Sequence, residues 1–470
     1  MLYLAIAIAR RCIRRRITRS LLHRSRGSTH NARRDLRRAV HLCTTSIVQD
    51  GGSGSKGGQI RGPGDPGLIS GTDRLDAHRR LPPEQTIARV KRFAGSFGIT
   101  RIANLTGLDR TGIPVVMVCR PNARSSAVFN GKGMNIAAAQ ASALMEAAET
   151  WHAENIRLPL QFASFADLQG RVPVVDVDGL PRTPTPPFDP HLPILWIEGC
   201  NLMDDGAIWL PFEIVHADSR MSGPPLSGAL AMSTNGLASG NRFPEAVSHA
   251  LCELIERDAT SLWHRSPPAE QDARRIDLAT VDDPTSLAVL DLLARAELDV
   301  GVWDITTDVG VSAFQCLVVD RAGDIGHIGV GAACHPARAT SLRRAVLEAA
   351  QVRTTYIIGS REDIEPADYD PAILARRTAE ARALMRPTDG TRSFQSAANT
   401  ECEGAEAEVA WLLARLRSIG LEQAVAVDLT QAEFCIPVVR MVVPGLEGSD
   451  HHHSQYWPGP RARAAEERRA

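Results

Sequence analysis

The chain has 470 residues, of which 44% are hydrophobic and 23% charged, and this ordinary globular composition provides enough apolar residues for a sizeable core. The formal net charge is only −1, but residues 1–47 carry twelve Arg and one Asp, so the remainder carries about −12. A mildly acidic folded part argues against a general nucleic-acid binder.

Cysteine usage and hydropathy bear on the compartment. The nine cysteines are scattered with no C-x-x-C arrangement, and an odd number cannot pair completely. This pattern supports neither a zinc knuckle nor a disulfide framework, and it favours a reducing, cytoplasmic setting. No apolar run approaches the ~20 residues that a membrane span needs, so we expect no membrane association.

The first 70 residues resemble an extension more than a domain. Residues 1–9 are apolar and an arginine cluster follows them, whereas a secretory signal carries its positive charge before the apolar segment. An organelle transit peptide and a basic arm stay open. The pattern favours a poorly structured extension or a start site placed too far upstream. Residues 50–67 are Gly-rich, as in flexible linkers, so we expect residues 1–70 to be disordered.

From residue 71, helix and strand patterns alternate, which indicates a folded domain over residues 71–460 of mixed α/β, or α+β, class. Short apolar runs with β-branched residues predict strands at residues 115–119, 311–319 and 436–443. Longer stretches predict helices at residues 136–155, 244–263, 340–358 and 405–419. Polar composition predicts loops and surface elements at residues 266–300 and 361–400, and a flexible tail at residues 461–470.

Three of the predicted helices carry the same polar stripe. The stripes are Ser142-x-x-x-Glu146-x-x-Glu149, His249-x-x-x-Glu253-x-x-Glu256 and Arg344-x-x-x-Glu348-x-x-Gln351. Spacings of four and three place each set on one helical face, and the second stripe extends back in steps of four to Asn241. The residues between are Ala, Leu, Ile, Val, Met and Cys. A narrow polar stripe in an apolar surround predicts buried helices whose stripes line an internal site.

The four glutamates on two of these helices would repel one another if they converged without cations. Mg²⁺ with nucleotide phosphates resolves this, because hard cations take oxygen ligands. Arg344, Arg353 and Lys132 could meet the phosphates. The alternative is that each Glu-x-x-Glu is a solvated face with ordinary salt bridges, which three matching stripes make less favourable than one.

Lys132 lies in a short Gly131-Lys132-Gly133 sequence. The glycines would let the backbone approach an anion closely, and the lysine offers one cation. The G-x-x-x-x-G-K-[ST] spacing of a Walker A motif is absent. Alone, this segment would be interpreted as a turn with a lysine.

At these residues the sequence resembles the YcaO family, particularly members encoded beside TfuA-type partner proteins. The resemblance runs from about residue 75 to about residue 460 and is densest at residues 98–110, 120–133, 142–147, 236–241, 253–258, 348–353 and 436–447. Two departures are Thr150, where the family usually has Arg, and Phe129, where a second Ser often stands. The resemblance implies helices packed on mainly antiparallel sheets.

The resemblance also implies an ATP site among the three helices. Glu146, Glu149, Glu253 and Glu256 match the Mg²⁺-binding positions. The positions of nucleotide contacts are matched by Ser125, Lys132, Ser142, Asn241, Arg344, Glu348, Gln351 and Arg353. No residue is assigned a direct catalytic role. His249 would be either a supporting residue of the site or, as we favour, a core histidine.

The reaction implied is activation of a peptide-backbone amide. A nucleophile adds to the carbonyl, the oxyanion takes the γ-phosphoryl group of ATP, and phosphate leaves with the former amide oxygen. External sulfide would form a thioamide, and a Cys, Ser or Thr side chain would form an azoline. The TfuA-type likeness and the lack of a Pro-x-Pro-x-Pro ending favour thioamidation.

Other functions stay open at this stage. An accessory factor for ribosomal-protein methylthiolation would need no turnover, but an intact set of carboxylates favours catalysis. A nucleic-acid or membrane-surface role would depend on the basic arm. The resemblance implies a peptide or protein substrate, a TfuA-like partner, a possible sulfide donor and a homodimer. The run His451–His453 is interpreted as a solvated loop, because adjacent residues cannot easily all face one ion.

Overall fold

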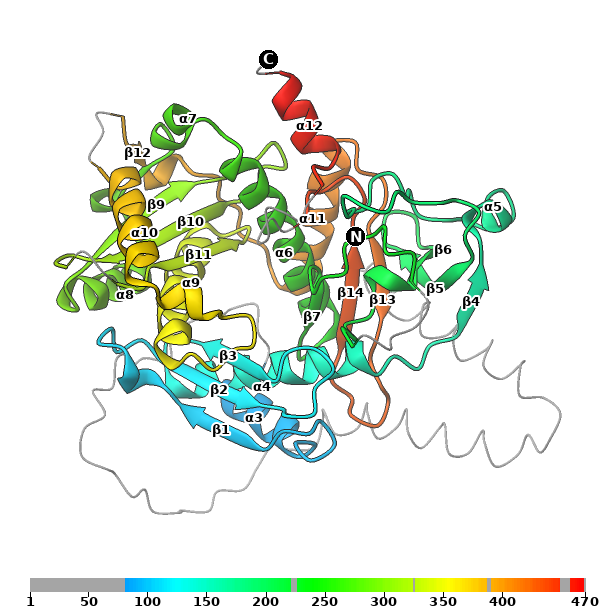
Figure 1. The fold of residues 1–470 in the computed structure, drawn as a ribbon, viewed down its shortest axis with the longest axis horizontal. Helices are drawn as coiled ribbons and strands as arrows, with labels where there is room; N and C mark the ends of the chain where they lie inside the picture. Colours follow the sequence, from blue (N-terminus) through cyan, green and yellow to red (C-terminus); the bar gives the residue numbers. More distant parts are fainter. Residues whose placement is uncertain (1–80, 221–225, 324–325, 387–389, 449–456, 469–470) are drawn as a thin grey trace. The chain divides into compact units, whose positions relative to one another are not determined.

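The computed structural model describes residues 81–220, 226–323, 326–386, 390–448 and 457–468. The predicted extension over residues 1–70, the predicted domain start at residue 71 and the histidine run at residues 451–453 lie outside the described residues. The remainder forms a mixed α/β fold in which helices pack on sheets that are mainly antiparallel (Figure 1). The predicted fold class is therefore confirmed.

Two three-stranded antiparallel sheets are each followed by a long helix that packs on the last strand. The first sheet has the order β1-β2-β3 and consists of β1 (Arg101–Asn104), β2 (Val115–Cys119) and β3 (Val128–Lys132), followed by α4 (Ile136–Glu154). The second has the order β11-β10-β9 and consists of β9 (Leu298–Asp304), β10 (Ala313–Asp320) and β11 (Gly329–Cys334), followed by α9 (Arg338–Ile358).

The third sheet has six strands and the order β4-β5-β13-β14-β7, with β6 paired to β5. Its strands are β4 (Leu160–Ala163), β5 (Ile194–Asn201), β6 (Gly206–Pro211), β7 (Leu237–Ser239), β13 (Val425–Asp428) and β14 (Val438–Val442). Central β14 is apolar at every position except Arg440 and is buried throughout. A short parallel pair joins β8 (Ile276–Asp277) to β12 (Arg392–Ser393).

Helix α6 (Phe243–His264) connects the sheets, because it contacts β7 and β14 of the six-stranded sheet and β11 of the second three-stranded sheet (Figure 1). Helix α11 (Ala405–Ser418) packs against α6, and α3 (Pro83–Lys91) packs against α4. The described residues also form α5 (Phe165–Leu168), α7 (Pro268–Asp272), α8 (Pro284–Arg295), α10 (Pro371–Leu384) and α12 (Pro460–Glu467).

Local chemistry explains where the long helices begin and end. The Asn135 side chain accepts a hydrogen bond from the Ala138 amide and so caps the start of α4. Gly359 ends α9 in the left-handed conformation, with φ +59°, which glycine adopts at little cost. The four predicted helices agree with the observed ones to within two residues at each end.

The predicted flexible tail differs from the structure. Residues 460–467 form α12, which contacts α6 and buries Ala462 completely. The Arg461 guanidinium lies 2.8 Å from the buried carboxylate of Asp258 on α6. A composition rich in Ala, Arg and Glu suits a helix as well as a tail, and only these tertiary contacts decide between them. The polar stretches at residues 266–300 and 361–400 likewise contain helices, among them α8 and α10.

Candidate active site

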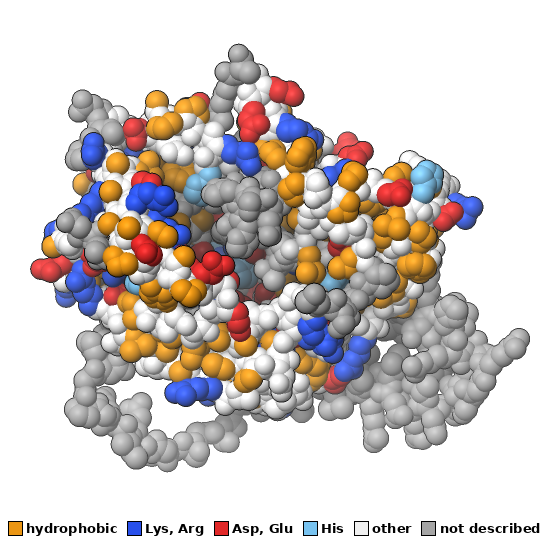
Figure 2. Space-filling model, viewed as in Figure 1, with side chains coloured by type: hydrophobic (Ala, Val, Ile, Leu, Met, Phe, Trp, Pro, Cys, Tyr) orange, Lys and Arg blue, Asp and Glu red, His pale blue; other side chains and the backbone are white. Residues whose placement is uncertain are grey.

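The polar stripes of α4, α6 and α9 lie on helices that are otherwise buried. On α4, residues 143, 144, 147 and 148 are fully buried, whereas Ser142, Glu146 and Glu149 are half-buried. The same contrast separates Glu253 and Glu256 on α6, and Glu348 and Gln351 on α9, from their apolar neighbours. In the view of Figure 2, acidic and histidine side chains lie deep in a hollow at the centre of the molecular surface. The predicted stripe in an apolar surround is confirmed.

The four predicted metal-binding glutamates influence one another electrostatically. Burial raises the pKa of Glu146 to about 7, and Glu253 and Glu348 contribute to the rise. Burial raises the pKa of Glu149 well above its usual range, with Glu253 and Glu146 adding to the effect. The stripes of α4, α6 and α9 therefore face one another.

Glu253 and Glu256 complete this acidic cluster from α6. Burial raises the pKa of both carboxyls, that of Glu256 to about 8, and Glu348 raises both further. Arg257 opposes these shifts, with guanidinium nitrogens 3.6 Å from Glu253 Oε1 and 3.3 Å from Glu256 Oε1. Carboxyls with such raised pKa values bind protons near neutral pH unless a cation takes the place of the protons.

Lys132 supplies a cation at the edge of this acidic cluster. Its Nζ lies 2.8 Å from Glu348 Oε2, and its charge lowers the pKa of Glu146 and Glu256. Gln351, one turn after Glu348, donates from Nε2 to the Asn130 carbonyl of β3 at 2.7 Å. Strand β3 and helix α9, far apart in the chain, therefore contribute adjacent predicted nucleotide contacts.

The glycines beside Lys132 let helix α4 lie close to β3. Gly131 lies in β3, and a Cβ there would stand 2.2 Å from both the Ala139 carbonyl oxygen and the Ala143 nitrogen of α4. At Gly133 a Cβ would stand 2.6 Å from that of Ala138. The absent side chains make room for the helix that carries Glu146.

The acidic cluster suits a metal ion that is shared with a ligand. Among the residues that the structure describes, no group of three acidic, histidine or cysteine side chains could hold a metal ion alone. Mg²⁺ usually takes one or two protein carboxylates and completes its octahedron with phosphate oxygens and water. Facing carboxylate oxygens with raised pKa values fit such an ion, because they are hard donors that lack a full complement of cations.

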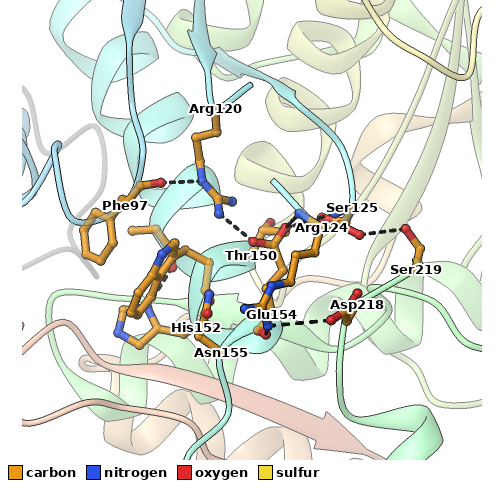
Figure 3. Close-up of polar contacts among 12 residues, drawn as sticks. Phe97, Arg120, Arg124, Ser125, Thr150, His152, Glu154, Asn155, Asp218 and Ser219 are labelled. Atoms are coloured by element: carbon orange, nitrogen blue, oxygen red, sulfur yellow. Dashed lines mark hydrogen bonds and ion pairs between the residues drawn. The ribbon is translucent and has the colours of Figure 1, made fainter. Parts of the chain in front are cut away.

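Ser125 is held by a carboxylate that the sequence analysis did not single out. Glu154, at the end of α4, is buried, and its Oε1 accepts hydrogen bonds from the Ser125 hydroxyl at 2.7 Å and from the amides of Arg124 and Ser125. Its Oε2 accepts from Arg120 at 2.6 Å, and Figure 3 shows these groups converging on it. The loop between β2 and β3 is thus fastened to α4. The Ser125 hydroxyl can donate to a nucleotide only if it leaves Glu154.

Arg353 lies apart from the stripe of α9. Its buried guanidinium forms ion pairs with Asp109 at 3.2 Å and Asp320 at 3.1 Å, and donates to the His327 carbonyl. These contacts bind α9 to the neighbouring strands and loops. Arg353 is not directed toward the predicted phosphates, because it lies two residues beyond Gln351 and so on another face of the helix.

The remaining predicted residues occupy varied positions. Asn241 begins the α6 stripe, where its Oδ1 accepts from Thr86 on α3 at 3.1 Å. Arg344 is half-buried on α9, one turn before Glu348. His249 is exposed, so the favoured interpretation as a core histidine is wrong. The register of α6 causes this, because His249 lies on the stripe and not on the buried face.

The two departures from the family pattern are explained by packing. Thr150 is buried and its hydroxyl donates to the Glu146 carbonyl one turn earlier. Phe129 is buried beneath Arg120, whose guanidinium carbon lies 5.4 Å from the ring centre.

Two further cations near the cluster were missed, namely Arg361 after α9 and Arg440 on β14. Arg361 lowers the pKa of Glu146, and Arg440 lowers that of Glu253. The signal for Arg440 was present in the sequence, since one arginine interrupts the strand Val438–Val442, which is otherwise apolar. Arg361 gave no signal, because it lies in a polar stretch.

Comparisons with known proteins agree with this arrangement. A family model described as YcaO cyclodehydratase, ATP- and Mg²⁺-binding, matches residues 130–447. A protein of Rhizobium leguminosarum bv. trifolii, described as an uncharacterized protein in the tfuA 3' region, is 35% identical over 376 residues. That alignment covers 78% of this chain and 88% of the relative.

Solved structures share the fold. The structure of YcaO from Methanopyrus kandleri bound with AMPPCP and Mg²⁺ superposes with a TM-score of 0.63 at 23% identity, covering 81% of this chain and 96% of that one. A heterocyclase in complex with substrate and cofactor gives a TM-score of 0.66 at 20% identity, covering 79% of this chain and 53% of that one. At these identities the likeness concerns the fold.

Among the described residues, no helix combines the length and apolarity needed to cross a membrane.

Proposed function

The chain belongs to the YcaO family, which binds ATP and Mg²⁺, and from this premise we propose that it phosphorylates the oxygen of a peptide-backbone amide to form a thioamide with a TfuA-type partner. The observation that carries the proposal is the set of four facing carboxylates on α4 and α6, with Lys132 and Arg257 beside them. A scaffold without turnover has no need of mutually repelling buried acids, which lower its stability.

Each predicted residue has a place in this proposal. The four acids Glu146, Glu149, Glu253 and Glu256 hold Mg²⁺, which when bound offsets the charge of the phosphates. Lys132 and Arg344 meet phosphate oxygens, because Lys132 borders the acidic cluster and Arg344 lies one turn before Glu348 on the stripe of α9. Ser142, Asn241, Glu348 and Gln351 contact the remainder of the nucleotide. Arg353 and, through Glu154, Ser125 support the site instead.

Sulfide is the proposed nucleophile. It adds to the amide carbon, the carbonyl oxygen takes the terminal phosphoryl group of ATP with release of ADP, and the carbon–oxygen bond then breaks. Phosphate leaves with the former amide oxygen and the sulfur loses its proton, which yields a thioamide. The relative in a tfuA 3' region supports this variant. A homodimeric, cytoplasmic protein supplied by a sulfide donor completes the proposal.

Azoline formation is the second candidate, and two observations favour it. The family is described as a cyclodehydratase, and one structural neighbour is a heterocyclase. In this variant a Cys, Ser or Thr side chain of the peptide takes the place of sulfide, and the net change is loss of water. The same four acids and the same phosphoryl transfer serve both reactions. A non-catalytic accessory role in methylthiolation is the third candidate, and the intact acidic cluster counts against it.

The test measures ADP release by the purified protein with ATP and Mg²⁺, with and without a co-encoded TfuA-like protein, sulfide and candidate peptide. The mass of the peptide is determined in the same reactions. Partner-dependent ADP release with replacement of one oxygen by sulfur is the expected result. Loss of one water would establish the azoline variant, and absence of nucleotide binding under every combination would refute the proposal in favour of the accessory role.

A further inference from the structure

Helix α3 carries none of the predicted site residues, yet it contacts the residue at which the stripe of α6 begins. It packs against α4, and its Thr86 is only 4% exposed. The Thr86 hydroxyl donates to Asn241 Oδ1 at 3.1 Å, across 155 residues of chain. A buried hydroxyl needs a hydrogen-bond partner, and here that partner is a predicted nucleotide contact.

Protein groups hold Asn241 at three points. Besides the bond from Thr86, Arg89 Nη1 donates to the Asn241 carbonyl at 3.2 Å, and the Asn241 amide donates to Glu245 Oε2 at 3.1 Å. Glu245 lies in the first turn of α6, so the last bond ties Asn241 to the start of the helix, in the manner of a capping box. These contacts fix both the backbone of Asn241 and its side-chain oxygen.

The segment that leads to Asn241 lies against the acidic cluster. Ser239, two residues earlier, donates from its hydroxyl to Glu149 Oε2 at 3.0 Å. A hydrogen bond from the backbone of Gly236, at the start of the same segment, lowers the pKa of Glu253. Two residues of chain span at most about 7 Å, so Asn241 lies near the edge of this cluster.

The side-chain nitrogen of Asn241 is open to a ligand. No described residue accepts a hydrogen bond from Nδ2, and Asn241 is half-buried, with Nδ2 not among the enclosed nitrogens that lack a partner. Because Thr86 binds Oδ1, the planar amide presents its N–H groups on the side away from α3. Such a donor at the edge of the cluster suits an acceptor oxygen of a nucleotide, on its ribose or its phosphates.

We propose that Thr86 is a positioning residue for nucleotide binding, whose hydroxyl fixes the Asn241 amide so that Nδ2 donates to an oxygen of the bound nucleotide. The inference rests on the proposed function, because it requires ATP in the acidic cluster. It gives α3, which lies outside the three striped helices, a part in the site. Without the hydroxyl the amide is free to rotate, and nucleotide binding then has to order it.

The experiment is a double-mutant cycle measured by nucleotide affinity. Calorimetry with Mg²⁺ gives the Kd of AMPPCP for wild type, Thr86→Val, Thr86→Ser, Asn241→Ala and the double variant Thr86→Val/Asn241→Ala. Valine removes the hydroxyl and keeps the branched shape, whereas serine keeps the hydroxyl. The control is Thr354→Val on α9, whose buried hydroxyl donates to the Ala350 carbonyl of its own helix.

The expected losses follow from the role of the hydroxyl. Thr86→Val should weaken AMPPCP binding about fivefold to tenfold, and Thr86→Ser should stay within about twofold of wild type. In the Asn241→Ala background, Thr86→Val should change the Kd less than about twofold, because the group that Thr86 orients is gone. Thr354→Val should bind AMPPCP as wild type does.

The contrary results are equally definite. An unchanged Kd in Thr86→Val or in Asn241→Ala, or the same loss with and without the Asn241 side chain, would overturn the assignment of Thr86 and leave the proposed function intact. Wild-type protein that does not bind AMPPCP would refute the proposed function first. Thermal unfolding checks the folding of each variant. If Thr86→Val does not fold, the cycle is repeated with Thr86→Ala and judged by the same criteria.

Discussion

Two regions of the molecule are built alike but carry different chemistry. In both, three antiparallel strands lead into a helix that packs on the last strand. A Cβ on Gly131 would stand 2.2 Å from the Ala139 carbonyl oxygen of α4, and one on Gly331 would stand 2.2 Å from that of Ala345 on α9. The same glycine contact thus fixes each helix to its sheet, and the two regions differ in the side chains that the helix carries.

The stripes differ in their position along the helix as well as in charge. Gly131 packs near Ala139 and Ala143, so Glu146 and Glu149 lie beyond the contact. Gly331 packs near Ala345 and Ala349, so Glu348 lies beside its contact. The stripe residues have the same spacing on both helices. Relative to the glycine contact, however, the stripe of α9 lies one helical turn closer to the N-terminus than the stripe of α4 does. The comparison teaches that one scaffold unit provides two acids, whereas the other provides an arginine, an acid and an amide.

The largest expected effect separates the two helices. Glu146→Gln should lower kcat/KM for ATP about 10³-fold, because it removes one proposed ligand of the Mg²⁺ ion that offsets negative charge during phosphoryl transfer. Gln351→Ala should lower it only about tenfold, because Gln351 already donates to the Asn130 carbonyl. Turnover kinetics measure both. Equal losses would contradict the division of roles between α4 and α9, and thermal unfolding without metal checks folding.

The glycine contacts test the shared scaffold. Gly131→Ala and Gly331→Ala should each cost about 3 kcal/mol in the free energy of unfolding, because the added carbon meets helix backbone that cannot move independently. Urea unfolding measures this cost. Gly95→Ala is the matched control, since no atom lies within 4 Å of the Cβ that it adds. A neutral result at only one of the two positions would break the equivalence of the two regions.

The two strands also differ at the position after the packed glycine, which is Lys132 in β3 and Ala332 in β11. Lys132→Ala should weaken Mg²⁺-AMPPCP binding by about 2 kcal/mol, through loss of a cation next to Glu348. Lys132→Arg should recover part of this. Calorimetry with Lys91→Ala as an exposed-lysine control measures the change. Unaltered affinity in Lys132→Ala would remove Lys132 from the site.

The smallest effect concerns pH and is confined to the acidic cluster. Burial raises the pKa of Glu146 to about 7 and that of Glu256 to about 8, from an ordinary value of 4.5. The folded state then binds protons more tightly than the unfolded state, so the stability that these groups contribute without metal is fully present below about pH 4.5. It is lost as the pH rises through 7 and 8.

We expect this loss to be about 1 to 2 kcal/mol for metal-free protein, measured as a fall in Tm between pH 5.5 and 8.5. Glu256→Gln should flatten the profile, because it removes one of the titrating groups. Saturating Mg²⁺ with AMPPCP should also flatten it, since the cation replaces the protons. A Tm of the metal-free protein that rises over this pH range would contradict the raised pKa values of these carboxyls.

Much of the site could be predicted because its pattern is local. The spacing of Glu146 and Glu149 on one face follows from 3.6 residues per turn, and the Ala and Leu residues between them predict burial. The core position expected for His249 failed although the same periodicity placed it on the polar stripe. The flexible tail predicted at residues 461–470 failed for a different reason, because the helix there depends on which segment packs against it, and composition does not contain that information.

Local periodicity alone was enough for the helices, the stripes and the mixed α/β class, since backbone geometry repeats every few residues. Tertiary structure decided which stripes face one another and which cations serve them. Lys132 meets Glu348 across 216 residues of chain, and Arg353 turns instead to Asp109. Arg440 reaches the acids only through the pairing of β14 with β7. Such contacts depend on strand register and helix docking, which arise from the packing of the whole fold and leave no periodic trace in sequence.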